Sequence, residues 1–170
     1  MLGSLIPSSR FLVKQLLRDV PWDDVRVIIE YGPGVGTISG EILRRMRPDA
    51  KLLVLEVNDD FVRVLRNRFS DPRLHVLHRS ATDIGEVLRE LGLGEADCAI
   101  AGIPFSIMKE QDRQAVLRNT HAALRTGGSF LVYQFSTRVR SDLEKIFGSV
   151  QQGFEPLNIL PARLFHCVKK

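Results

Sequence analysis

Residues 27–37 read Val-Ile-Ile-Glu-Tyr-Gly-Pro-Gly-Val-Gly-Thr, and this stretch decides the fold of the chain. Its first residues are apolar and β-branched, which predicts a buried parallel strand. Three alternating glycines then predict a sharp turn, because glycine adopts positive φ and lets a ligand approach the backbone closely. Over residues 37–47, apolar side chains recur at helical spacing. The stretch therefore predicts a strand, a turn and a helix that together cradle a nucleotide-like ligand.

The spacing of the glycines narrows the kind of ligand. A dinucleotide-binding turn needs a third glycine where this chain has Thr37, so NAD is disfavoured. The pattern is instead E-x-G-x-G-x-G, from Glu30 to Gly36. The next apolar run, residues 51–55, ends in Glu56. A carboxylate in that place can accept hydrogen bonds from both hydroxyls of a ribose.

This combination resembles motifs I and II of the class I S-adenosylmethionine-dependent methyltransferases, and the resemblance runs through nearly all 170 residues. It implies S-adenosyl-L-methionine as the cofactor, with the glycine turn passing under its methionine and ribose portions. The cofactor-binding residues that it implies in these two motifs are Glu30, Gly32, Gly34, Gly36 and Glu56.

A third cofactor contact is expected after the next strand, residues 74–77. Class I methyltransferases often carry an acidic residue there that hydrogen-bonds the adenine amine, and the matching position is Ser80, followed by Ala81. A serine hydroxyl can still accept that bond. Plain loop chemistry is the alternative for this pair. Asp83 is expected to cap the helix of residues 84–91.

The corner after the fourth strand bears on the methyl acceptor. Enzymes that methylate adenine or cytosine amino groups place Asn or Asp there, whereas Ala101 and Gly102 offer no side-chain acceptor. The corner resembles the S-G-x-P-x-S loop of bacterial phospholipid N-methyltransferases. That likeness implies that Gly102 lies beside the cofactor, that Pro104 and Phe105 wall the methyl-transfer channel, and that Ser106 lies near the substrate. The alternative is a rigid turn with one core phenylalanine.

Two further segments resemble the same lipid enzymes. Residues 3–9 are similar to their G-x-x-x-P-S-S motif, which implies that residues 1–20 fold over the cofactor site and that Ser8 and Ser9 lie near the substrate. Either serine is also placed to cap a helix beginning at about Arg10. The apolar face expected for that helix is Phe11, Leu12, Leu16 and Leu17. Residues 158–162 resemble the N-x-P-P-A turn of that family.

The alternation of strands and helices predicts an α/β fold: one Rossmann-like, doubly wound domain over residues 1–170, with a seven-stranded sheet in which the last strand is antiparallel. A helix over residues 111–124 is expected to stop at the glycine pair 127–128, before a fifth strand over 129–135. Ligands of such sheets bind beyond the carboxyl ends of the strands.

The composition of the chain limits the class of protein and the partners that it can have. The hydrophobic content of 44% is enough for one core, and no run of 18 apolar residues exists. The first twenty residues carry basic side chains in place of a secretory signal, so a cytoplasmic protein is expected. A net charge of +4 favours phosphate-bearing partners, either RNA or an anionic membrane that the protein contacts peripherally. The two cysteines have no partners at metal-binding spacing, so no metal is expected.

The resemblance as a whole implies a methyltransferase that acts on a phospholipid head-group amine such as that of phosphatidylethanolamine. The alternatives are an RNA adenine dimethylase, a related family, and a non-catalytic cofactor-binding scaffold. An alkyl amine must lose a proton before it reacts, since such amines titrate at about 9 to 10. Tyr31, Tyr133 and His121 are candidates to assist by residue type, and no spacing selects one of them.

Overall fold

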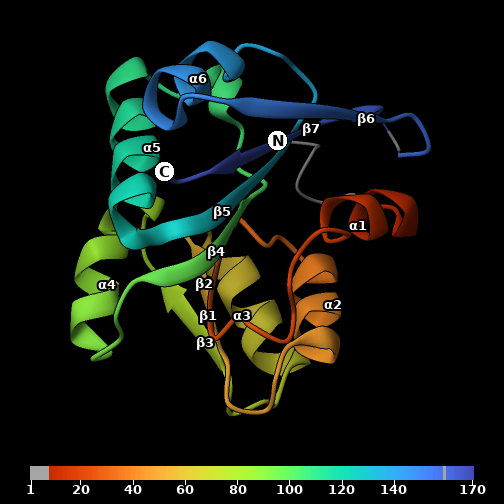
Figure 1. Cartoon of the computed structure of the whole chain (residues 1–170). Helices are drawn as coiled ribbons and strands as arrows, with labels where there is room; N and C mark the ends of the chain where they lie inside the picture. The colour runs from red at the N-terminus through yellow and green to blue at the C-terminus, as the bar shows by residue number, and fades with distance from the viewer. Residues whose placement is uncertain (1–7, 159) are drawn as a thin grey trace.

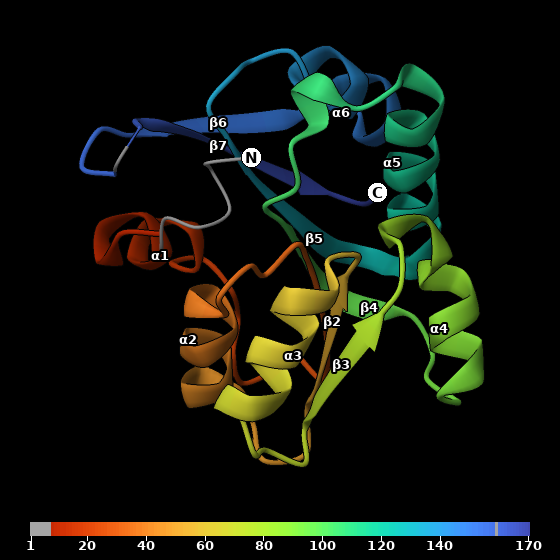
Figure 2. The same ribbon diagram turned by 180° about the vertical axis from the view of Figure 1, so that it is seen from behind.

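A computed structural model, which describes residues 8–158 and 160–170, shows a seven-stranded sheet with helices on both faces (Figures 1 and 2). The strand order is β3-β2-β1-β4-β5-β7-β6, and β7 runs antiparallel to both of its neighbours while the other pairs are parallel. The expected doubly wound sheet is confirmed. The strands are β1 Val27–Tyr31, β2 Lys51–Glu56, β3 Leu74–His78, β4 Ala96–Ala101, β5 Leu124–Gln134, β6 Val150–Glu155 and β7 Ala162–Val168.

Helices of the described part of the chain cover both faces of the sheet (Figure 1). One face carries α1 Arg10–Leu16, α2 Thr37–Arg45 and α3 Asp59–Arg68. The other carries α4 Ile84–Glu90, α5 Glu110–Ala123 and α6 Arg140–Phe147, with the short 3₁₀ turns η1 Ala81–Asp83 and η2 Phe105–Ile107. Because side chains alternate along a strand, each strand feeds both cores. On β1, Ile28 packs toward α2, whereas Ile29 and Tyr31 pack toward α5.

Three local expectations are wrong. Gly127 and its neighbour do not stop α5, because the helix ends at Ala123 and β5 begins at once. The glycines lie in a bulge of β5, where Gly127 has φ +77° and its N–H bonds Lys169 O at 2.7 Å. Phe11 is 41% exposed, and Val13 is buried instead. The side chain of Asp83 makes no capping bond to α4.

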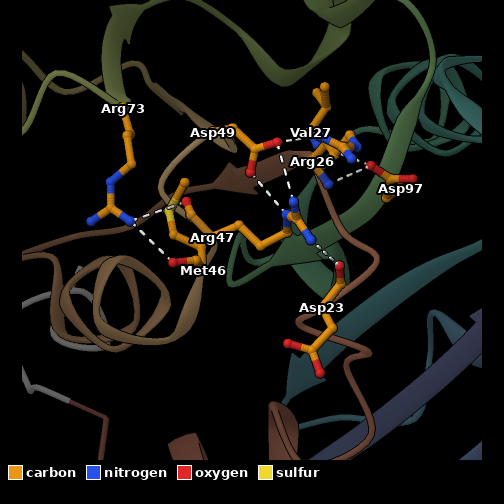
Figure 3. Close-up of polar contacts among 8 residues, drawn as sticks. All are labelled: Asp23, Arg26, Val27, Met46, Arg47, Asp49, Arg73 and Asp97. Atoms are coloured by element: carbon orange, nitrogen blue, oxygen red, sulfur yellow. Dashed lines mark hydrogen bonds and ion pairs between the residues drawn. The ribbon is translucent and has the colours of Figure 1, made fainter.

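The amino ends of the strands are held by a polar network (Figure 3). Asp97, in β4, accepts hydrogen bonds from the backbone N–H groups of Arg26 and Val27 at 2.8 and 2.9 Å. The guanidinium of Arg73 donates to the carbonyls of Met46 and Arg47 at 3.1 and 3.2 Å. These bonds fix the amino ends of the strands. The glycine turn lies at the opposite, carboxyl ends, and we call that side of the sheet the ligand edge.

Candidate functional site

The glycine turn has the strained geometry that its sequence predicts. Gly32, Gly34 and Gly36 have φ of +66°, +56° and +81°, values that side chains with a Cβ rarely adopt. A Cβ on Gly32 would lie 2.6 Å from Ile103 Cγ2, and one on Gly36 would lie 2.6 Å from Phe69 Cε2. Glycine is therefore required at Gly32 and Gly36 both by the backbone conformation and by the side chains packed against them.

Two carboxylates flank this turn from adjacent strands. Glu30, in β1, is only 2% exposed and accepts a 2.6 Å hydrogen bond from Ser39 Oγ. Burial raises the pKa of Glu30 to about 7, the Ser39 bond opposes that rise, and the charge of Glu56 adds to it. Glu56 ends β2, is also buried, and its Oε1 accepts from the N–H of Asn58 at 2.9 Å.

These groups fit S-adenosyl-L-methionine by their own chemistry. The three positive-φ glycines turn the backbone at the end of β1, just before the amino end of α2, and a turn in that place suits a ligand held against backbone N–H groups. Glu56 can accept from ribose hydroxyls. The buried charges of Glu30 and Glu56 complement a sulfonium cation.

Ser80 and Ala81, which are expected to contact adenine, lie in a loop on the same side of the sheet as Glu56. This follows because β3 pairs with β2 and places His78 opposite Glu56. The hydroxyl of Ser80 accepts from Thr82 N at 3.2 Å and from Thr82 Oγ1 at 2.8 Å, and so caps η1. Ala81 packs in the core. Contact of Ser80 and Ala81 with adenine stays a prediction.

The corner after β4 lies directly beside the glycine turn. Gly102 N–H donates to Tyr31 O at 3.0 Å, which extends the β1–β4 pairing. A Cβ on Gly102 would collide with the hydroxyl of Tyr133, from β5. Gln134 Nε2 donates to Ile103 O at 2.6 Å and so ties the corner to β5.

The residues expected to wall the methyl-transfer channel differ in their exposure. Phe105 is 0% exposed and packs in the core on the α5 face, as the alternative of a core phenylalanine expects, and its place in the channel wall stays a prediction. Pro104 is exposed and Ser106 is half-buried at the ligand edge. Their roles beside the substrate remain predictions.

The amino-terminal segment reaches the same edge. Ser9 Oγ accepts from Leu12 N at 3.2 Å and caps α1, and Ser9 N donates to Asn158 Oδ1 at 2.9 Å. The side chain of Ser8 hydrogen-bonds Tyr133. Two segments that resemble the lipid enzymes therefore meet, although residues 1–7 and residue 159 of those motifs lie outside the described part of the chain.

The sequence does not single out two residues of this site, Ser39 and Tyr133. The pattern places Ser39 only within a helix, and it does not rank Tyr133 above Tyr31 or His121. The only signal for Ser39 was its place on the buried face of the helix after the glycine turn. Within the described ranges, no three His, Cys, Asp or Glu side chains gather as a metal site would need.

Comparison with known proteins agrees with this geometry. A family model described as "Methyltransferase domain" matches residues 28–128. Ornithine lipid N-methyltransferase of Singulisphaera acidiphila is 30% identical over 168 residues, which is 98% of this chain and 88% of the relative.

Solved structures share the fold. Precorrin-6y C5,15-methyltransferase of Geobacter metallireducens superposes with a TM-score of 0.73 at 13% identity, covering 97% of this chain and 94% of that one. Magnesium protoporphyrin IX methyltransferase of Synechocystis, solved with bound SAM, gives 0.68 at 15% identity, covering 94% and 76%.

Proposed function

The chain belongs to the class I S-adenosylmethionine-dependent methyltransferases, and from that premise we propose that it methylates an amine in the head group of a membrane lipid. The observation that carries the proposal is the similarity to an ornithine lipid N-methyltransferase across nearly the whole of both chains. Ornithine presents an alkyl amine, as does the phosphatidylethanolamine expected from the sequence. Both lipids are therefore candidate acceptors.

The main task of the protein in methyl transfer is to position the acceptor relative to the cofactor. S-adenosylmethionine, when bound, supplies a methyl group already activated on a sulfonium. The residues of this chain must orient an amine nitrogen toward that methyl group and keep the nitrogen unprotonated, and orientation supplies much of the rate. Ala101 and Gly102 offer no amide or carboxylate to hold a nucleobase at the corner, which favours an alkyl amine over RNA.

Exposed apolar side chains border the ligand edge, and we call them the hydrophobic rim. The β6–β7 hairpin reaches toward α1 (Figure 1), and its end lies beside the carboxyl end of β5, since Gln134 pairs with Arg163. The hydrophobic rim comprises Phe11, Phe135, Phe154, Leu157 and Leu160. Exposed apolar groups gathered in one region are typical of a surface that binds a partner or a membrane.

Basic side chains accompany the hydrophobic rim. The guanidinium carbon of Arg163 lies 5.7 Å from the ring centre of Phe154, and that of Arg10 lies 4.9 Å from the ring centre of Phe11. Apolar groups interleaved with arginines match an anionic lipid interface, where acyl chains and phosphates are layered. This supports an acceptor taken from a membrane surface. No helix among the described residues is long and apolar enough to cross a bilayer.

The test is methyl transfer from labelled cofactor to ornithine lipid vesicles, phosphatidylethanolamine vesicles, structured RNA and free small amines under one set of conditions. We expect transfer to at least one of the two lipids and little to RNA. Faster methylation of RNA than of either lipid would contradict the proposal. Cofactor binding without transfer to either lipid would contradict it as well.

A further inference from the structure

The order of the strands indicates which side of the site receives the methyl acceptor. Glu56 ends β2, the glycine turn follows β1, and Gly102 follows β4. These strands are consecutive in the sheet, and β5 comes next. A cofactor whose ribose lies at Glu56 and whose methionine lies over the glycine turn leaves the β4–β5 side for the acceptor. Tyr133, near the end of β5, lies on that side.

The hydroxyl of Tyr133 is held against the backbone of the β4 corner. The position of a Cβ on Gly102 would overlap that hydroxyl and would lie 2.9 Å from Tyr133 Cε1. Gly102 does not share the positive φ of the glycines in the turn, so its conformation does not require glycine. The space that Tyr133 occupies does require it.

Two polar groups act on this hydroxyl. Ser8 hydrogen-bonds it, and the charge of Glu30 lies close enough to act on it. Burial, followed by the charge of Glu30, raises the pKa of Tyr133, while the Ser8 bond lowers it. Tyr133 is therefore a neutral phenol at physiological pH. Its oxygen can accept a hydrogen bond, and negative charge on Glu30 favours a cation near it.

The other candidates named from the sequence lie elsewhere. Tyr31 is buried in the core, where its hydroxyl lies 3.1 Å from Thr120 Oγ1. His121, on α5, packs edge-on against the ring of Phe147, with the ring centres 5.0 Å apart. The three atoms nearest to a Cβ on Gly102 all belong to Tyr133.

We propose that Tyr133 is a catalytic residue that receives the acceptor amine: its phenol oxygen accepts a hydrogen bond from the amine N–H, Ser8 fixes its orientation, and Glu30 stabilises the positive charge that the nitrogen gains. The inference rests on the proposed function, in which the acceptor is an amine. The nitrogen lone pair forms the C–N bond, the electron pair of the broken C–S bond stays on sulfur, and the product ammonium releases its proton to water. Tyr133 keeps its own proton throughout.

The chain has two tyrosines, which makes this role observable apart from turnover. Protein labelled with ¹³C at tyrosine Cζ gives one signal for Tyr31 and one for Tyr133, and the Tyr133→Phe variant assigns them. Addition of free ornithine or ethanolamine to the protein saturated with the demethylated cofactor should shift the Tyr133 signal and leave that of Tyr31 unchanged. A shift of neither signal, or of both equally, would overturn the inference.

Kinetics supply the second measurement. Tyr133→Phe should lower kcat with the lipid acceptor about ten- to a hundredfold, the range for one charge-assisted hydrogen bond, and leave cofactor affinity unchanged. Gly102→Ala should displace the hydroxyl and cause a similar loss. The double variant should be no worse than either single variant.

Tyr31→Phe is the matched control, because it removes the same atom from the core and should leave kcat unchanged. Full activity of Tyr133→Phe toward the lipid amine would overturn the role of Tyr133 alone. No methylation of any amine by the unmodified protein would overturn the proposed function, and this inference with it.

Discussion

The hydroxyl of Ser39 donates a 2.6 Å hydrogen bond to the carboxylate of Glu30, and both side chains are almost completely buried. A single hydroxyl does not replace the hydration of a carboxylate, so the pKa of Glu30 rises to about 7 with burial as the main cause. The fold therefore retains a destabilising charge beside the glycine turn. A cationic cofactor is the partner that would compensate it.

The first prediction concerns Glu30→Gln and pH. The folded pKa is raised from 4.5 to about 7, so the stability linked to this group is fully present below pH 4.5 and is lost as pH rises to about 7. The variant does not titrate there and can keep the Ser39 bond. Above pH 7 it should be more stable than the unmodified protein, by at most about 3 kcal/mol. Urea unfolding at pH 5 and pH 8 measures this, and an equal pH dependence of both proteins would contradict it.

The second prediction compares two glycines around Phe69. Gly36→Ala puts a Cβ at φ +81° and within 2.7 Å of Leu65 Cδ2, so it should cost about 1 to 3 kcal/mol. Gly40 lies inside α2, where a Cβ would approach Phe69 no closer than 3.5 Å. Gly40→Ala should therefore be neutral or stabilise by about 0.5 to 1 kcal/mol. Similar losses in both variants would show that crowding at Phe69, rather than the turn, sets the cost.

The third prediction isolates the ribose contact. Glu56→Ala should weaken cofactor affinity by about 1.5 to 3 kcal/mol, since a charged acceptor is lost. Glu41→Ala is the matched control, because Glu41 on α2 pairs with Arg45 at 2.5 Å and lies outside the glycine turn. Calorimetry with both folded variants distinguishes them. Unchanged affinity in Glu56→Ala would remove the ribose role.

The fourth prediction concerns the opposite edge of the sheet. Although burial raises the pKa of Asp97, hydrogen bonds from Val27, Arg125 and Arg26 outweigh it and lower the value. The stability that the Asp97 carboxylate contributes to the fold is fully present above pH 3.8 and is lost as pH falls through the folded pKa. Asp97→Ala should cost about 1 to 3 kcal/mol without changing cofactor affinity. Asp49 is more exposed, so Asp49→Ala should cost less than Asp97→Ala, and thermal melts compare the two.

How much could be predicted from sequence depended on how local each feature is. The glycine turn was predictable because seven consecutive residues carry its backbone requirement, and Gly32, Gly34 and Gly36 all adopt positive φ. The same reasoning failed at Gly127. A glycine after a helix reads as a stop, but here the backbone bonds Lys169, far along the chain, and forms a bulge.

In the candidate site, too, the features set by local sequence were predictable and those set by tertiary packing were not. Glu30 and Glu56 end or nearly end neighbouring strands, so their meeting follows from the parallel sheet alone. The contact of Ser8 with Tyr133 and the bond from Ser9 to Asn158 join segments that only tertiary packing brings together. The likeness of the Phe105 loop to the lipid enzymes does not specify which face of the sheet the ring enters, and the structure places the ring in the core on the α5 face.

The last prediction tests the hydrophobic rim at Leu160. This leucine has φ +65° and is 55% exposed, so the fold accepts backbone strain to hold an apolar side chain toward water. Asn158 Nδ2 donates to Leu160 O at 3.2 Å and helps to hold the turn. Glycine tolerates that φ, so Leu160→Gly should raise the free energy of unfolding by about 1 kcal/mol. If the variant is more stable yet binds membranes less tightly, the leucine side chain contributes to membrane binding while its backbone strain lowers the stability of the fold.

Sedimentation with anionic vesicles makes that measurement. Leu160→Gly should weaken vesicle binding about tenfold, since partial burial of one leucine in the interface contributes about 1.5 kcal/mol. Val168→Gly removes an exposed apolar side chain at the other end of β7, opposite Ser129, and should leave vesicle binding unchanged. Binding of the unmodified protein should also weaken as salt rises, because the arginine contribution is screened over about 8 Å at physiological ionic strength. Equal vesicle binding by both variants and the unmodified protein would show that the hydrophobic rim does not meet the membrane at Leu160. The strained backbone at Leu160 would then not be explained by lipid contact.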